Sequence, residues 1–336
     1  MNRLFPSERV SRGDGPVWEL PKGVQLSFKQ ETMDWAKTRS VTSLLVLHHG
    51  KIVLERYFHA TQPSDRRMSW SMAKSVLSAL FGIIRSDGHF DDLDEPVVRY
   101  VPRLKNGAYR DVTVRQVLQM TSGVKFDEDY MNPRSDINRM ARYLVSGGSM
   151  DDFVASLTDR EAAPGELWQY VSIDTHVLGM VIRGATGHGL PNLLSQHIFR
   201  RLGLEAEPYY VTDANGVAFA LGGLSLTTRD FARFALLMQN LGEVDGVQII
   251  PKHWVLASTV ASAPTTAGEA GYGYQWWIPA DAEAGEFCAR GIYGQYIYVN
   301  RKREAVIVST AADRNFRNEG VFENNIAKFR NLITSL

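Results

Sequence analysis

The 336-residue chain has little cysteine and no net charge: Cys288 is its single cysteine, and 37 lysines and arginines balance 37 aspartates and glutamates. A single cysteine excludes an intramolecular disulfide and leaves no cysteine pair for a zinc site. The balanced charge provides no overall field that would attract nucleic acid or an anionic membrane, so we expect neither partner. The composition favours a small substrate that binds locally.

Long apolar runs and metal-ligand motifs are also missing. No segment offers the ~20 uninterrupted apolar residues of a membrane helix, and the N-terminal stretch lacks the apolar run of a signal peptide. The eight histidines form no HExxH pattern, and no G-x-S-x-G marks a nucleophile elbow. We expect a cytoplasmic protein without metal or cofactor, and the sequence leaves its oligomeric state open.

Strand-like runs occur near both ends of the chain. Two β-rich stretches within residues 43–58 meet at His49-Gly50, a pair typical of a hairpin turn. Three more aromatic and β-branched runs lie toward the C-terminus: "YGYQWWI", "GQYIYVN" and "AVIVSTA". Between these ends the pattern is mostly helical, with "TVRQVLQMTSG", "INRMARYLVSGG" and "THVLGMVIRGATG" each closing on glycine, as helix ends prefer.

This order predicts an α/β fold of the α+β type. We expect one antiparallel sheet built from both termini and flanked by helices, with an all-helical domain inserted in the middle. Residues 1–85 and 226–336 would form the sheet domain, and residues 86–225 the helical domain.

The stretch "SWSMAKSVLSALFGI", residues 69–83, places a serine and a lysine at the start of an apolar helix. Ser71 and Lys74 are three residues apart, so on a helix their side chains share one face. A serine becomes nucleophilic when a neighbour removes its proton, and burial drives a lysine toward its neutral form. The spacing therefore predicts a nucleophile and its base, and the Ser71 N–H at the helix start can stabilise an oxyanion.

The same motif also has a purely structural explanation, in which Ser71 caps the helix and Lys74 extends to solvent. A second S-x-x-K, from Ser122 to Lys125, shows that the pattern alone is weak, although Gly123 there more naturally ends a helix. The position of Ser71 ahead of an apolar helix favours the catalytic interpretation.

A lysine base needs a partner that passes its proton to the leaving group, and a tyrosine can do this. Three tyrosines stand in a Y-x-[NS] pattern. Tyr298 falls within a predicted strand, so we interpret it as structural. Tyr130 follows an acidic loop that could line a cleft, and Tyr170 precedes a helix that Ser172 could cap. We rank Tyr170 first as the catalytic tyrosine and Tyr130 second.

The ordered motifs resemble the serine β-lactamase and penicillin-binding protein superfamily, whose signature begins with S-x-x-K. Within it, the chain is most similar to the class C-like branch, which includes D-alanyl-D-alanine carboxypeptidases, β-lactamase-fold carboxylesterases and 6-aminohexanoate-dimer hydrolase. The likeness runs from about residue 40 to the C-terminus, and its motifs are "SWSMAKS", "VTVRQVLQMTSGV", "PGELWQYVSIDTHVLGMVI", "GGLSLTTRDFARFALLM", "YGYQWW" and "ARGIYGQYIYV".

The resemblance implies roles for the predicted residues. Ser71 would be the acylated nucleophile, Lys74 its base partner and Tyr170 the proton relay. Tyr130 matches a tyrosine in the substrate-side loop of the 6-aminohexanoate-dimer hydrolase group. Ile292, which follows the third motif, would add its backbone N–H to that of Ser71 and complete an oxyanion hole.

The third motif departs from the family pattern. Ala289-Arg290-Gly291 stands where relatives often carry K-T-G or H-T-G, and Ser172 replaces the Asn of Y-x-N. Both changes point away from strong β-lactamase activity. Arg290 could hold a substrate carboxylate or pair with Glu286 at the surface, and we favour the surface pair.

Aromatic residues and the remaining polar candidates have two interpretations each. Trp277 and Tyr130 could form a substrate wall or belong to the core, whereas three other aromatics, Tyr293, Tyr296 and Trp276, are more typical of sheet core. We expect Cys288 to be a packed, inert thiol and two histidines, His49 and His176, to be structural.

These residues predict a serine hydrolase that forms an acyl-enzyme on Ser71 and cleaves carboxylic esters of small substrates. The alternatives are an amidase or peptidase acting on D-amino acid or 6-aminohexanoate-type linkages, a weak β-lactamase, and a binding or sensing module without turnover. The expected substrate-binding residues are Tyr130, Ser172, Trp277, Arg290 and Gly291.

Overall fold

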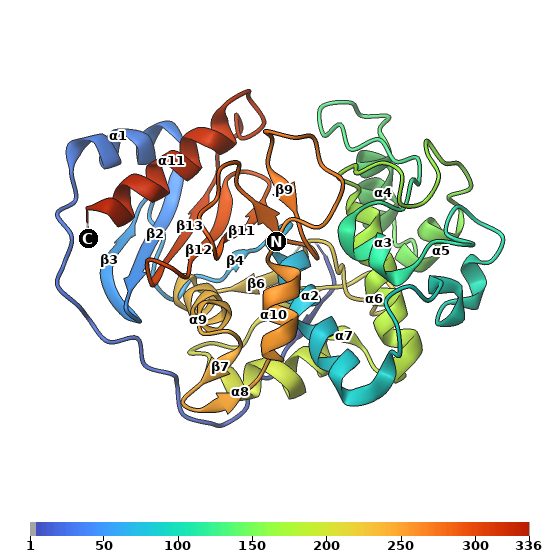
Figure 1. Ribbon diagram of the computed structural model, residues 1–336, viewed down its shortest axis with the longest axis horizontal. Helices are drawn as coiled ribbons and strands as arrows, with labels where there is room; N and C mark the ends of the chain where they lie inside the picture. The colour runs from blue at the N-terminus through green and yellow to red at the C-terminus, as the bar shows by residue number, and fades with distance from the viewer. Residues whose placement is uncertain (1–4, 336) are drawn as a thin grey trace.

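A seven-stranded antiparallel sheet forms one half of the molecule in the computed structural model, which describes residues 5–335. The strand order is β3-β2-β13-β12-β11-β10-β9, so strands from the two ends of the chain lie side by side (Figure 1). This confirms the predicted antiparallel sheet built from both termini. Its strands are β2 (Val41–His48), β3 (Lys51–Tyr57), β9 (Gly271–Tyr272), β10 (Trp277–Ile278), β11 (Glu286–Gly291), β12 (Gln295–Asn300) and β13 (Ala305–Ala311).

The hairpin between β2 and β3 turns at the predicted pair. His49 and Gly50 both have positive φ, 47° and 72°. Two successive left-handed residues give the two-residue turn whose twist matches that of the flanking strands. The hairpin expected from the sequence is therefore confirmed.

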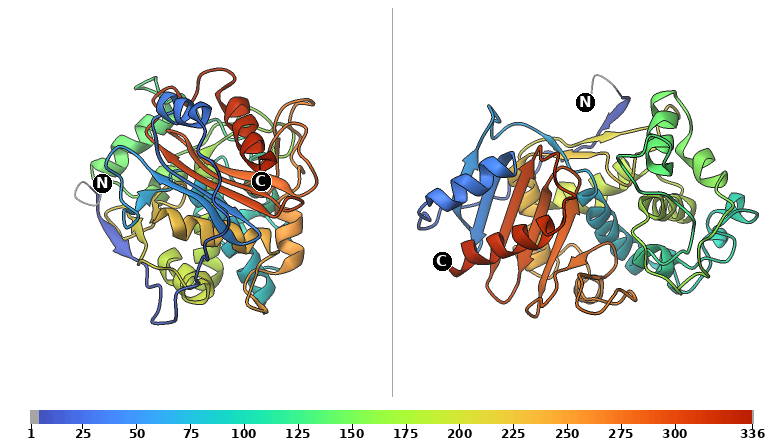
Figure 2. Two further views of the ribbon diagram at one scale, coloured as in Figure 1. Left: turned by 90° about the vertical axis from the view of Figure 1, so that its left-hand side faces the viewer. Right: turned by 90° about the horizontal axis from the view of Figure 1, so that it is seen from above.

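Alternate residues of the central strands enter two separate apolar clusters, one on each face of the sheet. In β12, Tyr296 and Tyr298 belong to one cluster, and Ile297 and Val299 to the other. This follows from the two-residue period of a strand. Helices α1 (Gln30–Thr38) and α11 (Val321–Thr334) cover the first face, as Figure 2 shows, while α2 (Met72–Ile84) and α9 (Thr228–Gln239) pack on the second.

The other half of the molecule is mostly helical. Here α2 contacts both the sheet and α6, so it lies between the two halves (Figure 1). The remaining helices are α3 (Val114–Gln119), α4 (Asp136–Val145), α5 (Met150–Ala155), α6 (Ser172–Thr186), α7 (Leu190–Leu194), α8 (Arg200–Leu202) and α10 (Lys252–Ser258); short 3-10 and π segments are η1 (Arg85–His89), η2 (Val97–Arg99), η3 (Pro102–Leu104) and η4 (Ser195–Phe199).

A small second sheet joins segments from both predicted domains. Its order is β1-β5-β6-β4, and β5 lies inside the interval 86–225 while pairing with β1. The middle interval is therefore not purely helical. The boundaries at residues 85 and 225 stay a prediction, and residues 1–4 and 336 of the sheet interval lie outside the described residues. The bounds are β1 (Ser7–Arg9), β4 (Arg67–Met68), β5 (Tyr209–Val211) and β6 (Leu224–Leu226), with a separate hairpin of β7 (Glu243–Val244) and β8 (Val247–Gln248).

Two of the three predicted glycine helix ends hold. Helix α6 ends at Gly187 in the left-handed conformation, and Gly147 follows α4 with a positive φ. Helix α3 instead ends at Gln119, and the residue after it, Met120, has a φ of 55°, three residues before Gly123. The expectation that α3 runs to Gly123 was wrong because the left-handed turn already occurs at a methionine.

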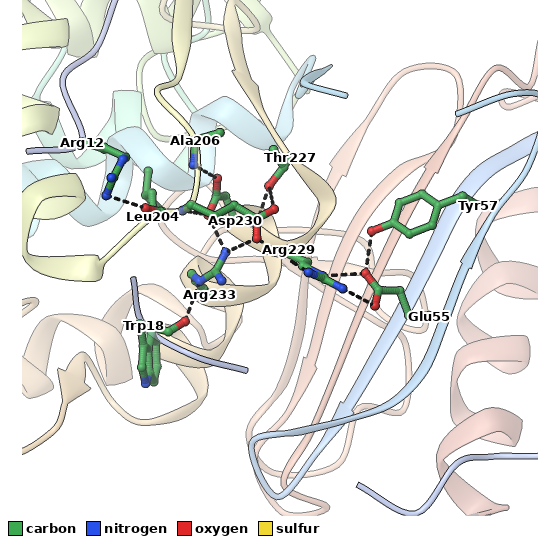
Figure 3. Close-up of polar contacts among 11 residues, drawn as sticks. Arg12, Trp18, Glu55, Tyr57, Leu204, Ala206, Thr227, Arg229, Asp230 and Arg233 are labelled. Carbon is green, nitrogen blue, oxygen red and sulfur yellow. Dashed lines mark hydrogen bonds and ion pairs between the residues drawn. The ribbon is translucent and has the colours of Figure 1, made fainter. Parts of the chain in front are cut away.

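A buried ion-pair network fixes α9 against its neighbours (Figure 3). The carboxylate of Asp230, fully buried, accepts the backbone N–H groups of Glu205 and Ala206 and the guanidinium of Arg233 at 2.7 Å. The residue before Asp230, Arg229, forms a bidentate pair with Glu55 of β3. Every charge in this network has a partner, which is the condition for tolerating charge in a core.

Candidate active site

Ser71 lies immediately before α2, between the two halves of the molecule. Its backbone is helical, with φ −65° and ψ −5°, whereas the preceding Trp70 has a φ of +45°. A left-handed conformation is strained for a bulky residue and usually persists only where the surroundings impose it. The chain therefore turns sharply at Trp70 and presents Ser71, which is half-buried, to a cavity.

Lys74 lies one helical turn further on and is almost completely buried, with an exposed fraction of 2%. Its Nζ donates to the carbonyl oxygen of Leu221 at 3.2 Å. Burial lowers the pKa of the amine to about 7, against the opposing influence of two carboxylates, Glu128 and Asp174. A lysine with this pKa is partly neutral near pH 7, so it can accept a proton. The alternative in which Lys74 extends to solvent is wrong.

Tyr170 stands two residues before α6 and faces the lysine: its ring centroid lies 5.6 Å from Lys74 Nζ. Burial and the charge of Glu128 raise the pKa of the phenol, and an interaction with the Ser71 side chain opposes this. The ring stacks on Trp277 at 5.4 Å. Near neutral pH the phenol keeps its proton, so in this pair Lys74 is the available acceptor and Tyr170 the available donor.

The end of β11 approaches the segment before Ser71. A Cβ atom built on Gly291 would lie 2.6 Å from the carbonyl oxygen of Ser69 and 3.1 Å from Cβ of Trp70, so only glycine permits this approach. In residues 5–335, neither the Ser71 N–H nor the Ile292 N–H donates to a protein acceptor. Two free donors beside a nucleophile suit the predicted oxyanion hole.

Glu128 is the main polar residue that the sequence did not single out. Its carboxylate accepts the hydroxyl of Tyr130 at 2.8 Å and both the N–H, at 3.0 Å, and the hydroxyl of Ser172. Ser172 is the first residue of α6, and the cap position is Val171. The N–H and the hydroxyl of Ser172 both donate to Glu128. The expectation that Ser172 caps the helix was wrong because its hydroxyl is engaged across the site.

A second unpredicted carboxyl group lies behind the lysine. Asp174 is fully buried, and its Oδ1 accepts the hydroxyls of Tyr109 at 2.6 Å and Ser122 at 2.8 Å. Its Oδ2 has no partner among the described residues. Burial raises the pKa of Asp174 to about 7, and the positive charge of Lys74 works against this shift. Lys74 and Asp174 thus titrate in the same range as a coupled pair.

A cavity of about 320 Å³ opens in front of Ser71, and we call it the catalytic cavity. Seven of the predicted site residues line it, whereas Lys74 and Ser172 lie behind its wall. Glu128, Gln169, Phe316 and Arg317 line it without having been predicted. The predicted residues in the wall are Ser71, Tyr130, Tyr170, Trp277, Arg290, Gly291 and Ile292.

Arg290 turns toward the catalytic cavity and not toward Glu286. Its guanidinium lies 4.6 Å from the ring of Phe322 and 5.2 Å from that of Trp277. Glu286 instead accepts from Arg330 at 2.7 Å and from Tyr298 at 2.8 Å. The favoured surface pair was wrong because Arg330 occupies that carboxylate, which leaves Arg290 stacked on aromatic rings.

The residues interpreted as structural are packed or paired. Cys288 is buried, and burial raises the pKa of its thiol to about 12. His176 bonds Asp151 at 2.9 Å inside the helical half, and Tyr298 bonds Glu286. Trp276 and Tyr296 are core residues, as expected, whereas Tyr293 is partly exposed and lines a second cavity next to Ser71.

The described part of the chain, residues 5–335, shows neither a metal-binding cluster nor a membrane-spanning helix. In that part of the chain no three or more His, Cys, Asp or Glu side chains are grouped so as to hold a metal ion. No helix there has the length and apolar character needed to cross a membrane. Location in the cell and the absence of a cofactor stay predictions.

The amino-acid sequence of this chain matches a family model and a relative of known function. The Beta-lactamase family model matches residues 30–328. The chain is 29% identical to 6-aminohexanoate-dimer hydrolase of Paenarthrobacter ureafaciens over 330 residues, which span 93% of this chain and 83% of the relative.

Solved structures of related proteins have the same fold as this chain. A protein from Bacillus anthracis, described as a candidate 6-aminohexanoate-dimer hydrolase, superposes with a TM-score of 0.87 at 26% identity, covering 100% of this chain and 93% of that one. A D-stereospecific amidohydrolase from Streptomyces superposes with a TM-score of 0.65 at 20% identity, covering 84% of this chain and 93% of that one. At this lower identity the likeness extends to the fold alone.

Proposed function

Because this chain belongs to the Beta-lactamase family, we propose that it is a serine hydrolase that forms an acyl-enzyme on Ser71. One observation carries the proposal: Lys74, one helical turn from Ser71, is buried and has a pKa lowered to about 7. Such an amine is a base at neutral pH, whereas an exposed lysine is not.

In the proposed reaction, neutral Lys74 takes the proton from Ser71 Oγ as that oxygen bonds to the substrate carbonyl carbon. The carbonyl oxygen becomes an oxyanion and accepts from the N–H groups of Ser71 and Ile292. Tyr170 donates its proton to the leaving group and regains one from Lys74 as the acyl–leaving-group bond breaks. Water then attacks the acyl-enzyme ester and its proton passes to the same pair. Lys74 returns a proton to Ser71 Oγ as the bond between that oxygen and the acyl carbon breaks, which releases the acid.

The substrates we propose are carboxylic esters of small acids. Ala289 supplies no charge at the first position of the third motif, and Arg290 is held over two aromatic rings. Both features weaken the case for a β-lactam substrate. Relatives that recognise penicillins hold the substrate carboxylate with a charged or polar residue of the third motif. An ester also has a better leaving group than an amide, so it makes the smaller demand on Tyr170.

Amide hydrolysis is the second candidate, and one observation favours it. The relative that covers 93% of this chain is named for the hydrolysis of 6-aminohexanoate dimer. A linear amide of an amino acid, including a D-amino acid, therefore belongs among the test substrates.

The test is turnover of p-nitrophenyl acetate and p-nitrophenyl butyrate by the wild type and by Ser71→Ala, with nitrocefin and a linear amide assayed in parallel. We expect sustained ester hydrolysis that Ser71→Ala abolishes. A single stoichiometric burst would indicate the binding or sensing module, and hydrolysis that survives Ser71→Ala would contradict the proposal. Mass spectrometry after a fluorophosphonate should locate the adduct on Ser71.

A further inference from the structure

A second cavity of about 180 Å³ meets the catalytic cavity at the proposed nucleophile. Ser71, Tyr130 and Ile292 line both cavities, so they stand at the junction between them. A carbonyl group attacked by Ser71 at this junction has two substituents, the acyl chain and the leaving group. The geometry therefore offers a separate space to each.

The two cavities differ in charge. Glu128, Arg290 and Arg317 line the catalytic cavity, whereas no charged side chain of the described residues lines the second one. Most of its wall is apolar, and it is formed by the turn before α2, by α4, by the loop between β5 and β6 and by the turn after β11. These wall residues are Trp70, Ile137, Met140, Phe219, Leu221 and Tyr293.

The side-chain amide of Asn138, which lies in this wall, already donates its hydrogen bonds to the protein. Asn138 lines the second cavity, but its Nδ2 donates to the carbonyl oxygens of Tyr130 at 3.0 Å and Asn132 at 2.9 Å. These bonds hold the loop that carries Tyr130. A charged group that entered this cavity would lose its water without gaining an ionic partner, which is costly.

The proton donor decides which half of the substrate enters which cavity. Tyr170 lines the catalytic cavity and does not line the second one. In the proposed reaction its hydroxyl protonates the leaving group, and the attacking water later takes the same place. The leaving group therefore occupies the catalytic cavity, which leaves the second cavity for the acyl chain.

We infer that the second cavity is an acyl-binding subsite that takes an uncharged chain and excludes one ending in an ammonium or carboxylate group. This inference rests on the proposed function. The volume of the second cavity, about 180 Å³, limits the length of the acyl chain that it can hold. An apolar cavity of about 150 Å³ holds benzene, which has six carbon atoms, so this cavity fits an acyl chain of about six carbon atoms.

The experiment varies the acyl chain while the leaving group stays the same. We would measure kcat/KM for the p-nitrophenyl esters of acetic, butyric, hexanoic, decanoic and 6-aminohexanoic acid. The expected optimum lies at butyrate to hexanoate. The 6-aminohexanoate ester, which adds only an ammonium group, should be hydrolysed at least ~100-fold less efficiently than hexanoate, because that charge is buried without a partner.

A filling substitution tests the location of the subsite. Ala141 lines this cavity from an exposed position on α4, where leucine preserves the helix. Ala141→Leu should lower the hexanoate-to-acetate ratio of kcat/KM at least ~10-fold, since each lost methylene contact weakens binding severalfold. The matched control is Ala327→Leu, the same change at an exposed position on α11 that lines neither cavity; it should leave the ratio unchanged.

Two results would overturn the inference while the proposed function stands. One is equal hydrolysis of the 6-aminohexanoate and hexanoate esters; the other is an unchanged ratio in Ala141→Leu with acetate still turned over. Failure of the proposed function looks different, because no ester would then be hydrolysed in a Ser71-dependent way.

Discussion

Lys74 Nζ lies 5.6 Å from the ring centroid of Tyr170, and the two side chains have opposite pKa shifts. Burial lowers the pKa of the amine and raises that of the phenol, because in each case it disfavours the charged form. Burial at one place thus favours the neutral form of both side chains, a neutral base beside a neutral acid. This pairing supports the proposed roles of Lys74 as the base and Tyr170 as the proton donor.

The first prediction concerns pH. Since neutral Lys74 is the active form in the proposed reaction and its pKa is about 7, kcat/KM for a non-ionisable ester should rise as pH increases through about 7 and then level off. Hydrolysis rates between pH 5 and pH 9 measure this. A profile that is flat across this range, or that falls with increasing pH, would rule out Lys74 as the base.

The second prediction separates the two candidate tyrosines. Tyr170→Phe should lower turnover at least ~100-fold, the usual scale for losing a proton-transfer group, and so should Lys74→Ala. Tyr130→Phe is the matched comparison, because Tyr130 also lines the catalytic cavity but bonds Glu128. Loss of activity in Tyr130→Phe with a normal rate in Tyr170→Phe would reverse the assignment.

The third prediction concerns Asp174. Its negative charge favours protonated Lys74, so Asp174→Asn should move the inflection of the pH profile from about 7 to lower pH. Asparagine can still accept from Tyr109 and Ser122 through its carbonyl oxygen. The pH dependence of kcat/KM measures the shift, while a melting curve checks the fold. An unmoved inflection in a stable variant would mean that the two groups are not coupled.

The fourth prediction concerns the close approach of β11. Gly291→Ala should lower kcat by about 10²–10³-fold, the scale for losing an oxyanion donor, because the added Cβ displaces Ile292 from Ser71. Gly189→Ala is the control, since a Cβ there has no neighbour nearer than 3.9 Å. Near-normal kcat in Gly291→Ala would show that Ile292 is not the second donor.

The fifth prediction concerns stability. Asp230→Ala should lower the free energy of unfolding by about 3–5 kcal/mol, because it removes the acceptor of two backbone N–H groups and leaves buried Arg233 with Glu205, at 3.3 Å, as its remaining carboxylate partner (Figure 3). Urea unfolding measures the change. Glu283→Ala, at an ion pair on the surface, should cause a much smaller loss. Equal losses in both variants would contradict the assigned importance of the buried network.

Local sequence patterns were enough to predict much of the fold. The turn at His49-Gly50 needs only local φ preferences, and α2 and α11 follow from helical spacing of apolar residues. The end of α3 at Met120 could not be predicted, because a methionine in the left-handed conformation is imposed by packing. The pairing of β5 with β1 likewise depends on contacts between distant segments.

Some residues of the candidate site could likewise be predicted from local sequence, and others could not. Ser71, Lys74 and Tyr170 stand in short motifs, so their sequence neighbours reveal them. Glu128 and Asp174 carry no such mark: one lies in an acidic loop and the other inside a helix. Their importance arises from their positions near Lys74, where Asp174 is fully buried and Glu128 lines the catalytic cavity. Only the folded chain could reveal them, although Glu128 is two residues from the predicted Tyr130.

Ser71 and Ile292, the two proposed oxyanion donors, are more than two hundred residues apart in the chain, and β11 must be in place before they meet. A growing polypeptide on the ribosome, or a proteolytic fragment that lacks its last strands, therefore has the nucleophile but no complete site. Hydrolysis would begin only after β11 has been synthesised and has joined the sheet, so catalytic activity is a sensitive reporter of correct folding in this protein.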